Sequence, residues 1–147
     1  IIAECLKTRK IDATVGYKLS GVLPDEGTVN RGIFKSKNGF VSEINEMFEL
    51  KKSNIQEKKL TVNSLCSMNL FGLRNETVRE LCSVLKKFKE ANKYDKAVEC
   101  LLPVEISNLV KSGRIKMALL PTEDRWFGLT NSEDEEIVRV KLKNEKT

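Results

Sequence analysis

The first third of the chain carries short runs of alternating apolar and polar residues, which are typical of β-strands. Residues 13–19 predict one strand, and residues 32–36 and 40–47 predict two more. Asn38-Gly39 separates the last two runs, and these two residue types accept the positive φ angles that a two-residue hairpin turn requires. The pattern therefore predicts a β-hairpin preceded by a single strand.

The period of the apolar positions changes after the hairpin. Residues 49–59 are polar and rich in lysine, which predicts an exposed connection, and the apolar run 65–73 predicts a buried central strand. A helix should then begin with Asn75 as its N-cap and end near Asn92. Its apolar stripe repeats every 3.6 residues and consists of Val78, Leu81, Cys82, Leu85 and Phe88.

The last third of the chain predicts a second helix and further strands. Pro103 suits a first helical turn and Gly113 suits a helix end, with an apolar face at Ile106, Leu109 and Val110 between them. Residues 114–120 and 125–129 predict strands. Ser132 and Glu135 form a capping box for a last helix, although residues 138–142 also fit a strand. Because strands and helices alternate, we expect an α/β fold with a mixed sheet flanked by helices.

The chain begins inside an apolar helical pattern. Ile1, Ile2, Cys5 and Leu6 share one helix face, and no capping residue stands before them. We therefore expect the chain to be part of a longer polypeptide.

The length and composition indicate one compact domain. The chain has 147 residues, of which 40% are hydrophobic and 32% charged, so it can bury a core. It has no apolar run of about 18 residues and no signal-peptide pattern. We expect no membrane partner and a cytoplasmic location.

The residue types exclude several classes of site. The chain has no histidine, which removes Ser-His-Asp and Cys-His catalysis and zinc sites that need His. None of its 8 glycines forms Gly-x-Gly or a phosphate-loop pattern, which removes a dinucleotide fingerprint and a P-loop.

The net charge of +5 invites a nucleic-acid interpretation, but the charge distribution argues against it. Basic and acidic residues alternate, and the few aromatic residues are not interleaved with the basic ones. A solvated mixed surface is the better interpretation, so we expect no nucleic-acid partner. The four cysteines form no Cys-x-x-Cys pair, and four buried thiols explain them more simply than a disulfide: Cys5, Cys66, Cys82 and Cys100.

Two further features have two interpretations each. The acidic run 133–136 could bind a cation, but carboxylates in the first turn of a helix commonly serve the helix dipole. Trp126-Phe127 could be a ligand platform, but such aromatic residues more often belong to the core.

Four segments give the chain a resemblance to a known family. They are Val15–Leu19 with Glu26–Ile33, then Gly39–Glu46, then Ser67–Gly72, and last Leu101–Pro103 with Leu119–Thr130. In this order they resemble the sugar-phosphate nucleotidyltransferases, and most closely a poorly characterised bacterial branch of that family. The resemblance runs from about Ala13 to Leu142.

The resemblance implies a fold and a reaction. These enzymes join a nucleoside triphosphate to a sugar 1-phosphate and release pyrophosphate, and their N-terminal half carries the glycine-rich loop and holds magnesium. This chain matches the C-terminal, sugar-binding half, so residues 1–147 would be that half of a partial nucleotide-diphospho-sugar transferase fold, with the nucleotide-binding half absent. The chain alone would then be inactive. The reaction needs positioning and charge neutralisation more than a base, which agrees with the absence of histidine.

The resemblance also carries four substrate-binding residues onto this sequence: Arg31, Gly32, Glu46 and Asn69. Gly32 would let the backbone approach the sugar, although it could simply open a strand. Glu46 would accept hydrogen bonds from sugar hydroxyls, or be an exposed strand carboxylate. Asn69 would be a buried polar residue beside the sugar, or make a structural hydrogen bond. No catalytic or metal-binding residue is expected in this chain.

Three departures from the family pattern open an alternative. Met47 stands where a basic residue would meet the sugar phosphate, Gly128 stands where many members have a metal-binding Asp, and residues 100–104 have diverged. The alternative is a non-catalytic module for binding a sugar nucleotide or for assembly. A half sheet would also expose an edge strand and apolar faces, so we expect self-association.

Overall fold

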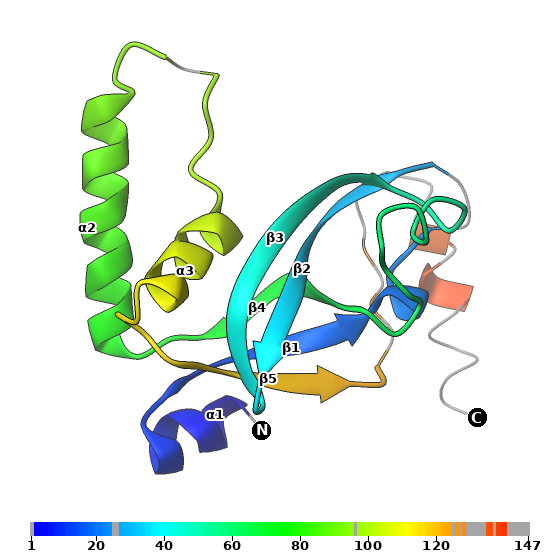
Figure 1. Ribbon diagram of the computed structural model, residues 1–147, viewed down its shortest axis with the longest axis horizontal. Helices are drawn as coiled ribbons and strands as arrows, with labels where there is room; N and C mark the ends of the chain where they lie inside the picture. The colour runs from blue at the N-terminus through cyan, green and yellow to red at the C-terminus, as the bar shows by residue number, and fades with distance from the viewer. Residues whose placement is uncertain are drawn as a thin grey trace.

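The computed structural model describes residues 2–24, 27–95 and 97–124, together with positions 126, 128, 135, 136 and 138–140. Within them lie five strands, β1 (Asp12–Lys18), β2 (Val29–Lys37), β3 (Phe40–Leu50), β4 (Leu65–Gly72) and β5 (Met117–Thr122). They close into a barrel in the order β1-β4-β2-β3-β5, with only β1 and β5 parallel among the described neighbours (Figure 1). The mixed α/β class is confirmed, and each described strand has two neighbours, so the predicted open edge is wrong.

The β2–β3 hairpin is the longest paired element of the barrel. Its turn at Asn38 and Gly39 has φ angles of 53° and 78°, which confirms the hairpin that the sequence predicts. The pairing continues to Val29 and Leu50, beyond the predicted strand ends. β3 pairs with β5 at Phe40 and Ala118, and the rest of β3 extends beyond this pairing.

Two longer helices lie outside the barrel, α2 (Asn75–Ala91) and α3 (Leu102–Lys111). Shorter helical pieces are α1 (Ile2–Glu4), a π-helical stretch at Cys5–Arg9 and a 3-10 turn at Leu19–Gly21. Both long helices were predicted, and the positive φ of Gly113 follows α3 as expected. Of the predicted strand at residues 125–129 only Trp126 and Gly128 are described, and neither is in a strand; Ser132 of the predicted capping box lies outside the described residues, and residues 138–140 are helical rather than a strand.

The predicted N-cap of α2 is wrong by one residue. Arg74 occupies the N-cap position, and its side chain makes no capping bond. Instead the buried Asp12 carboxylate, from β1, accepts hydrogen bonds from the Arg74 backbone N–H at 2.7 Å and from Thr77 Oγ1 at 2.6 Å. A carboxylate from another element thus satisfies the free donors at this helix start.

The core has two main clusters. One fills the barrel end near β1, β2 and β4 and contains Leu19, Val22, Leu23, Ile33, Leu50, Ile55, Leu60 and Cys66. The other packs α3 against the hairpin and β5 and contains Phe34, Val41, Ile44, Ile106, Met117 and Leu119. The second cluster fixes where α3 sits, and thus positions the site described below.

The sequence predicts that β4 is buried along its whole length, but part of the strand is exposed. Its register with β1 shifts so that Met68, Asn69 and Leu70 lie opposite the single residue Val15. This bulge turns Asn69 into the left-handed region, with a φ angle of 57°, and exposes both Asn69 and Leu70. A run of apolar letters cannot reveal such a bulge, because the bulge depends on the partner strand.

The cysteines also differ from expectation. All four are free, and only Cys5 and Cys66 are buried, whereas Cys82 is exposed and Cys100 half-buried. Burial raises the pKa of the Cys66 thiol to about 11.

Among the described helices, none is long and apolar enough to cross a membrane.

Candidate functional site

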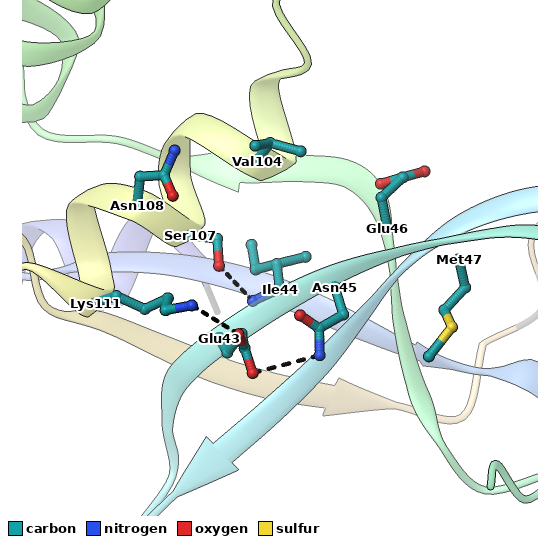
Figure 2. A pocket seen from close by; sticks show the side chains of 9 residues that line it. All are labelled: Glu43, Ile44, Asn45, Glu46, Met47, Val104, Ser107, Asn108 and Lys111. Atoms are coloured by element: carbon teal, nitrogen blue, oxygen red, sulfur yellow. Dashed lines mark hydrogen bonds and ion pairs between the residues drawn. The ribbon is translucent and has the colours of Figure 1, made fainter. Parts of the chain in front are cut away.

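An open pocket of about 470 Å³ lies between β3 and α3 (Figure 2). One wall is the run Glu43–Met47 of β3, and the other is one side of α3, with Val104, Ser107, Asn108 and Lys111. Several polar side chains therefore face one space from a strand and a helix. Most of this lining is polar or charged, and the apolar residues are Ile44, Met47 and Val104.

α3 is fastened over β3 by a buried hydrogen bond. The Ile44 backbone N–H donates to Ser107 Oγ at 2.8 Å, where strand pairing with β5 has already ended. Ile106 buries its side chain in the same contact. The helix thus covers a strand edge that would otherwise carry a free donor, and it defines the pocket wall.

Gly32 and Glu46 lie directly opposite each other in the β2–β3 register. A Cβ atom added at Gly32 would lie 3.0 Å from Ile44 Cγ2, 3.3 Å from Glu46 Oε2 and 3.5 Å from Pro103 Cβ. Any larger residue would therefore crowd the Glu46 carboxylate. The structure brings these two predicted site residues together and gives a physical reason for the glycine.

The Glu46 carboxylate is half-buried, and it has no hydrogen-bond partner among the residues that the structure describes. Desolvation raises its pKa, and the charge of Arg31 opposes that rise. Two acceptor oxygens without protein donors, at the wall of a pocket, can bind hydroxyl or amide donors of a ligand.

Arg31 lies beside this wall, but it is not part of the pocket lining. Its guanidinium donates to the Asn30 carbonyl at 2.9 Å and to the Val22 carbonyl at 3.4 Å, and it stacks on the Trp126 ring at 5.7 Å. Burial lowers its pKa, and its buried Nε has no partner in the described part of the chain. Arg31 thus influences Glu46 through charge rather than as a lining residue.

Asn69 does not join the site. Its side chain is exposed on the β4 bulge instead of buried, and its backbone N–H donates to Ser67 Oγ at 3.1 Å. The bulge removes Asn69 from the interior position that the sequence predicts. Its role as a substrate-binding residue stays a prediction without support from the pocket geometry.

The pocket contains residues that sequence reasoning missed. Lys111 and Lys35 donate to Glu43 at 2.9 Å and 2.8 Å, and these bonds lower the pKa of Glu43 to about 2. Glu43 and Lys111 stand 68 positions apart in the chain, so no motif spacing joins them. Their only signal is the fold itself, which lays the end of α3 over the hairpin.

The described residues do not fit a magnesium site. No group of three His, Cys, Asp or Glu side chains gathers within them. In the pocket, Glu43 is already bound by two lysines, which leaves Glu46 as a single carboxylate.

Trp126 is 37% exposed and stacks on Arg31, so the prediction that it is a core residue is wrong. Phe127 and residues 133 and 134 of the acidic run lie outside the described part.

No protein-family model matches the chain, and no curated protein matches it. The interpretation of the pocket therefore depends on the residues themselves and on the ordered segments of the sequence.

Proposed function

We propose that this chain is the sugar-side part of a nucleotidyltransferase that joins a nucleoside triphosphate to a sugar 1-phosphate and releases pyrophosphate. One observation carries the proposal. The Glu46 carboxylate, without protein donors, stands over the Gly32 backbone at the wall of an open pocket. Vicinal hydroxyls of a sugar ring suit two such acceptor oxygens, and the missing Cβ at Gly32 leaves the Glu46 carboxylate its place beside the strand.

The chain's own residues would bind and orient the acceptor. Glu46 would fix the ring through its hydroxyls, and Gly32 would keep the space beside β2 that the Glu46 carboxylate occupies. Lys111 lines the pocket, and together with Lys35, which pairs with Glu43 from outside the lining, it exceeds the charge of Glu43 by one. The net positive charge there would attract the phosphate of the acceptor. The sugar phosphate oxygen would then attack the α-phosphorus of a nucleotide bound elsewhere.

The described residues supply neither a triphosphate loop nor a metal cluster, so the chain by itself would bind acceptor without turnover. Magnesium belongs to the complete enzyme in this proposal, held mainly by a nucleotide-binding half. The proposed partners are a sugar 1-phosphate and a nucleoside triphosphate or nucleotide sugar.

One observation favours a second candidate, a non-catalytic module that holds a sugar nucleotide or serves assembly. Met47 lines the pocket beside Glu46, and it packs against the buried cluster at the barrel end. An apolar thioether offers no charge to a phosphate next to the ring. This candidate predicts binding of the sugar without dependence on its phosphate.

The test is a calorimetric titration of the chain with a panel of hexose 1-phosphates and the corresponding free hexoses. We expect at least one hexose 1-phosphate to bind. We expect Glu46→Gln to weaken that binding about 10-fold or more, because hydrogen bonds to a charged acceptor contribute about 1.5–3 kcal/mol. Gly32→Ala should weaken it as well, since the new methyl group would crowd Glu46.

The matched control is Glu57→Gln, which removes the same charge from an exposed turn outside the pocket. Its affinity should equal that of the unaltered chain. Equal affinity for a hexose and its 1-phosphate would support the non-catalytic candidate. Absence of binding by the whole panel, or binding that Glu46→Gln leaves unchanged, would contradict the proposal.

A further inference from the structure

Of the described residues that line the pocket, Lys111 is the single cation. It belongs to the last turn of α3, and its side chain is 55% exposed, so a ligand in the pocket can reach the ammonium group. Its ion-pair partner is Glu43, whose Oε1 accepts a hydrogen bond from Lys111 Nζ at 2.9 Å. The attraction of the pocket for an anion therefore depends on this one ion pair.

Glu43 does not need Lys111 in order to stay paired. Its other oxygen, Oε2, accepts a hydrogen bond at 2.8 Å from Lys35, which comes from β2 and does not line the pocket. Two cations thus share one carboxylate through different oxygens, and one positive charge is in excess. If Lys111 turned to a ligand, Glu43 would keep its bond to Lys35. The exchange would not leave a partly buried carboxylate without a counter-ion.

The position of α3 does not depend on the Lys111–Glu43 pair either. The Ile44 N–H donates to Ser107 Oγ, and Ile106 is fully buried beneath the helix. At the end of α3, the Ser112 and Gly113 N–H groups donate to helix carbonyls, which weakens the negative field of the helix end around Lys111. The pocket wall should therefore remain in place when Lys111 changes its partner.

Lys111 and Glu46 lie at opposite ends of the pocket lining, with Ile44 between them (Figure 2). Glu43, the partner of Lys111, precedes Glu46 by three strand residues, which span about 10 Å. A phosphate beside Glu46 would meet a carboxylate and the uncharged Met47, whereas a phosphate beside Lys111 would meet a cation. In a sugar 1-phosphate the phosphate and a pair of vicinal hydroxyls lie on opposite sides of the ring, which suits this separation.

We infer that Lys111 leaves Glu43 and binds the phosphate of the acceptor sugar, while Glu46 binds the hydroxyls on the far side of the ring. This inference rests on the proposed function, and it names the residue that separates a sugar 1-phosphate from a free sugar. Glu43 competes with the phosphate for Lys111. Substitution of Lys111 and substitution of Glu43 should therefore change the affinity for the phosphate in opposite directions.

The test is calorimetry of the full chain with a hexose 1-phosphate that binds it and with the same free hexose. Lys111→Met should lower the affinity for the 1-phosphate about 10-fold or more and leave that for the hexose unchanged, because a charged hydrogen bond is lost. Lys111→Arg should restore most of the affinity. Glu43→Gln should raise it about 2-fold to 5-fold, a gain that a damaged fold would not produce.

The matched controls are Lys93→Met and Glu90→Gln, which remove an exposed ion pair outside the pocket lining and should leave both affinities unchanged. If the 1-phosphate binds through Glu46 but keeps its affinity in Lys111→Met, or loses affinity in Glu43→Gln, the inference is overturned and the proposed function stands. Equal affinity for the hexose and its 1-phosphate would overturn the inference as well. If no hexose 1-phosphate binds, or Glu46→Gln has no effect, both are overturned.

Discussion

α3 and α2 show the same kind of apolar stripe in sequence, yet α3 buries Ile106 and Leu109, whereas α2 packs only the partly buried Leu81 against the second core cluster. Ile106 of α3 is fully buried between the hairpin and β5 and Leu109 is almost fully buried, whereas Val78 and Leu85 of α2 remain close to half exposed. A periodic stripe therefore shows that a helix has a face to cover, but not what covers it. In this chain the covered face builds a pocket, whereas Val78 and Leu85 of α2 stay exposed.

The largest effect should come from the covered stripe. Ile106→Ala removes a fully buried side chain, and we expect it to lower the free energy of unfolding by about 2–5 kcal/mol. Leu85→Ala should change it by less than about 0.5 kcal/mol, since that side chain is largely solvated in the monomer. Urea unfolding, at a dilution where the chain is monomeric, measures both. Equal losses would show that α2 is packed like α3.

An intermediate effect should come from the tie that holds α2 to the barrel. Thr77→Val keeps the side-chain shape but removes the hydroxyl that donates to the buried Asp12 carboxylate. We expect a loss of about 1–3 kcal/mol, because an acceptor is left unsatisfied. Hydrogen exchange should become faster in the first turns of α2 and stay unchanged in α3. Ser83→Ala, on an exposed position of the same helix, is the control; exchange that rises equally in both helices would contradict a local tie.

The smallest effect should come from the ion pairs that join α3 to the hairpin. Lys35 and Lys111 lower the pKa of Glu43 to about 2, below its unfolded value of about 4.3. The folded state therefore gains stability from Glu43 above pH ~4.3 and loses it as the pH falls toward 2.

Glu43→Gln should remove this part of the acid sensitivity, so the curves of unfolding free energy against pH should converge below pH ~4. The difference should shrink in high salt, because the pairs are near the surface. Glu57→Gln provides the control without such partners. If the difference in unfolding free energy between the two proteins grew toward low pH, it would contradict a lowered pKa of Glu43 in the folded state.

The sequence correctly predicted those elements whose signals come from neighbouring residues. The Asn38-Gly39 turn, the alternation on both sides of it and Pro103 at the start of α3 each depend on neighbouring residues, and each is confirmed. The β4 bulge depends on β1, and the cap of α2 depends on Asp12, more than 60 positions away. No single stretch of sequence contains those two outcomes.

The candidate site divides along the same line. The turn alone would place Gly32 opposite Asn45, and the register shift between Lys35 and Ser36 brings Glu46 there instead, so the two residues could be predicted but not their pairing. The α3 wall could not, since Ser107 and Lys111 reach β3 only once the barrel and the second core cluster have formed. Asn69 was predicted to lie beside the sugar because the sequence indicates its strand. The sequence does not indicate the bulge in that strand, which exposes Asn69.

The central claim is that the Gly32–Glu46 wall, the part of the β3 side of the pocket where Glu46 pairs with Gly32 of β2, binds a sugar 1-phosphate. Amide chemical-shift mapping tests this claim most directly. The chain, labelled with nitrogen-15, is titrated with a hexose 1-phosphate that binds in calorimetry. We predict saturable shifts concentrated at Gly32, Glu46 and Met47 and along α3 from Val104 to Lys111, with α2 unaffected. Shifts confined to other strands or to α2, with the Gly32–Glu46 wall silent at saturation, would contradict the claim.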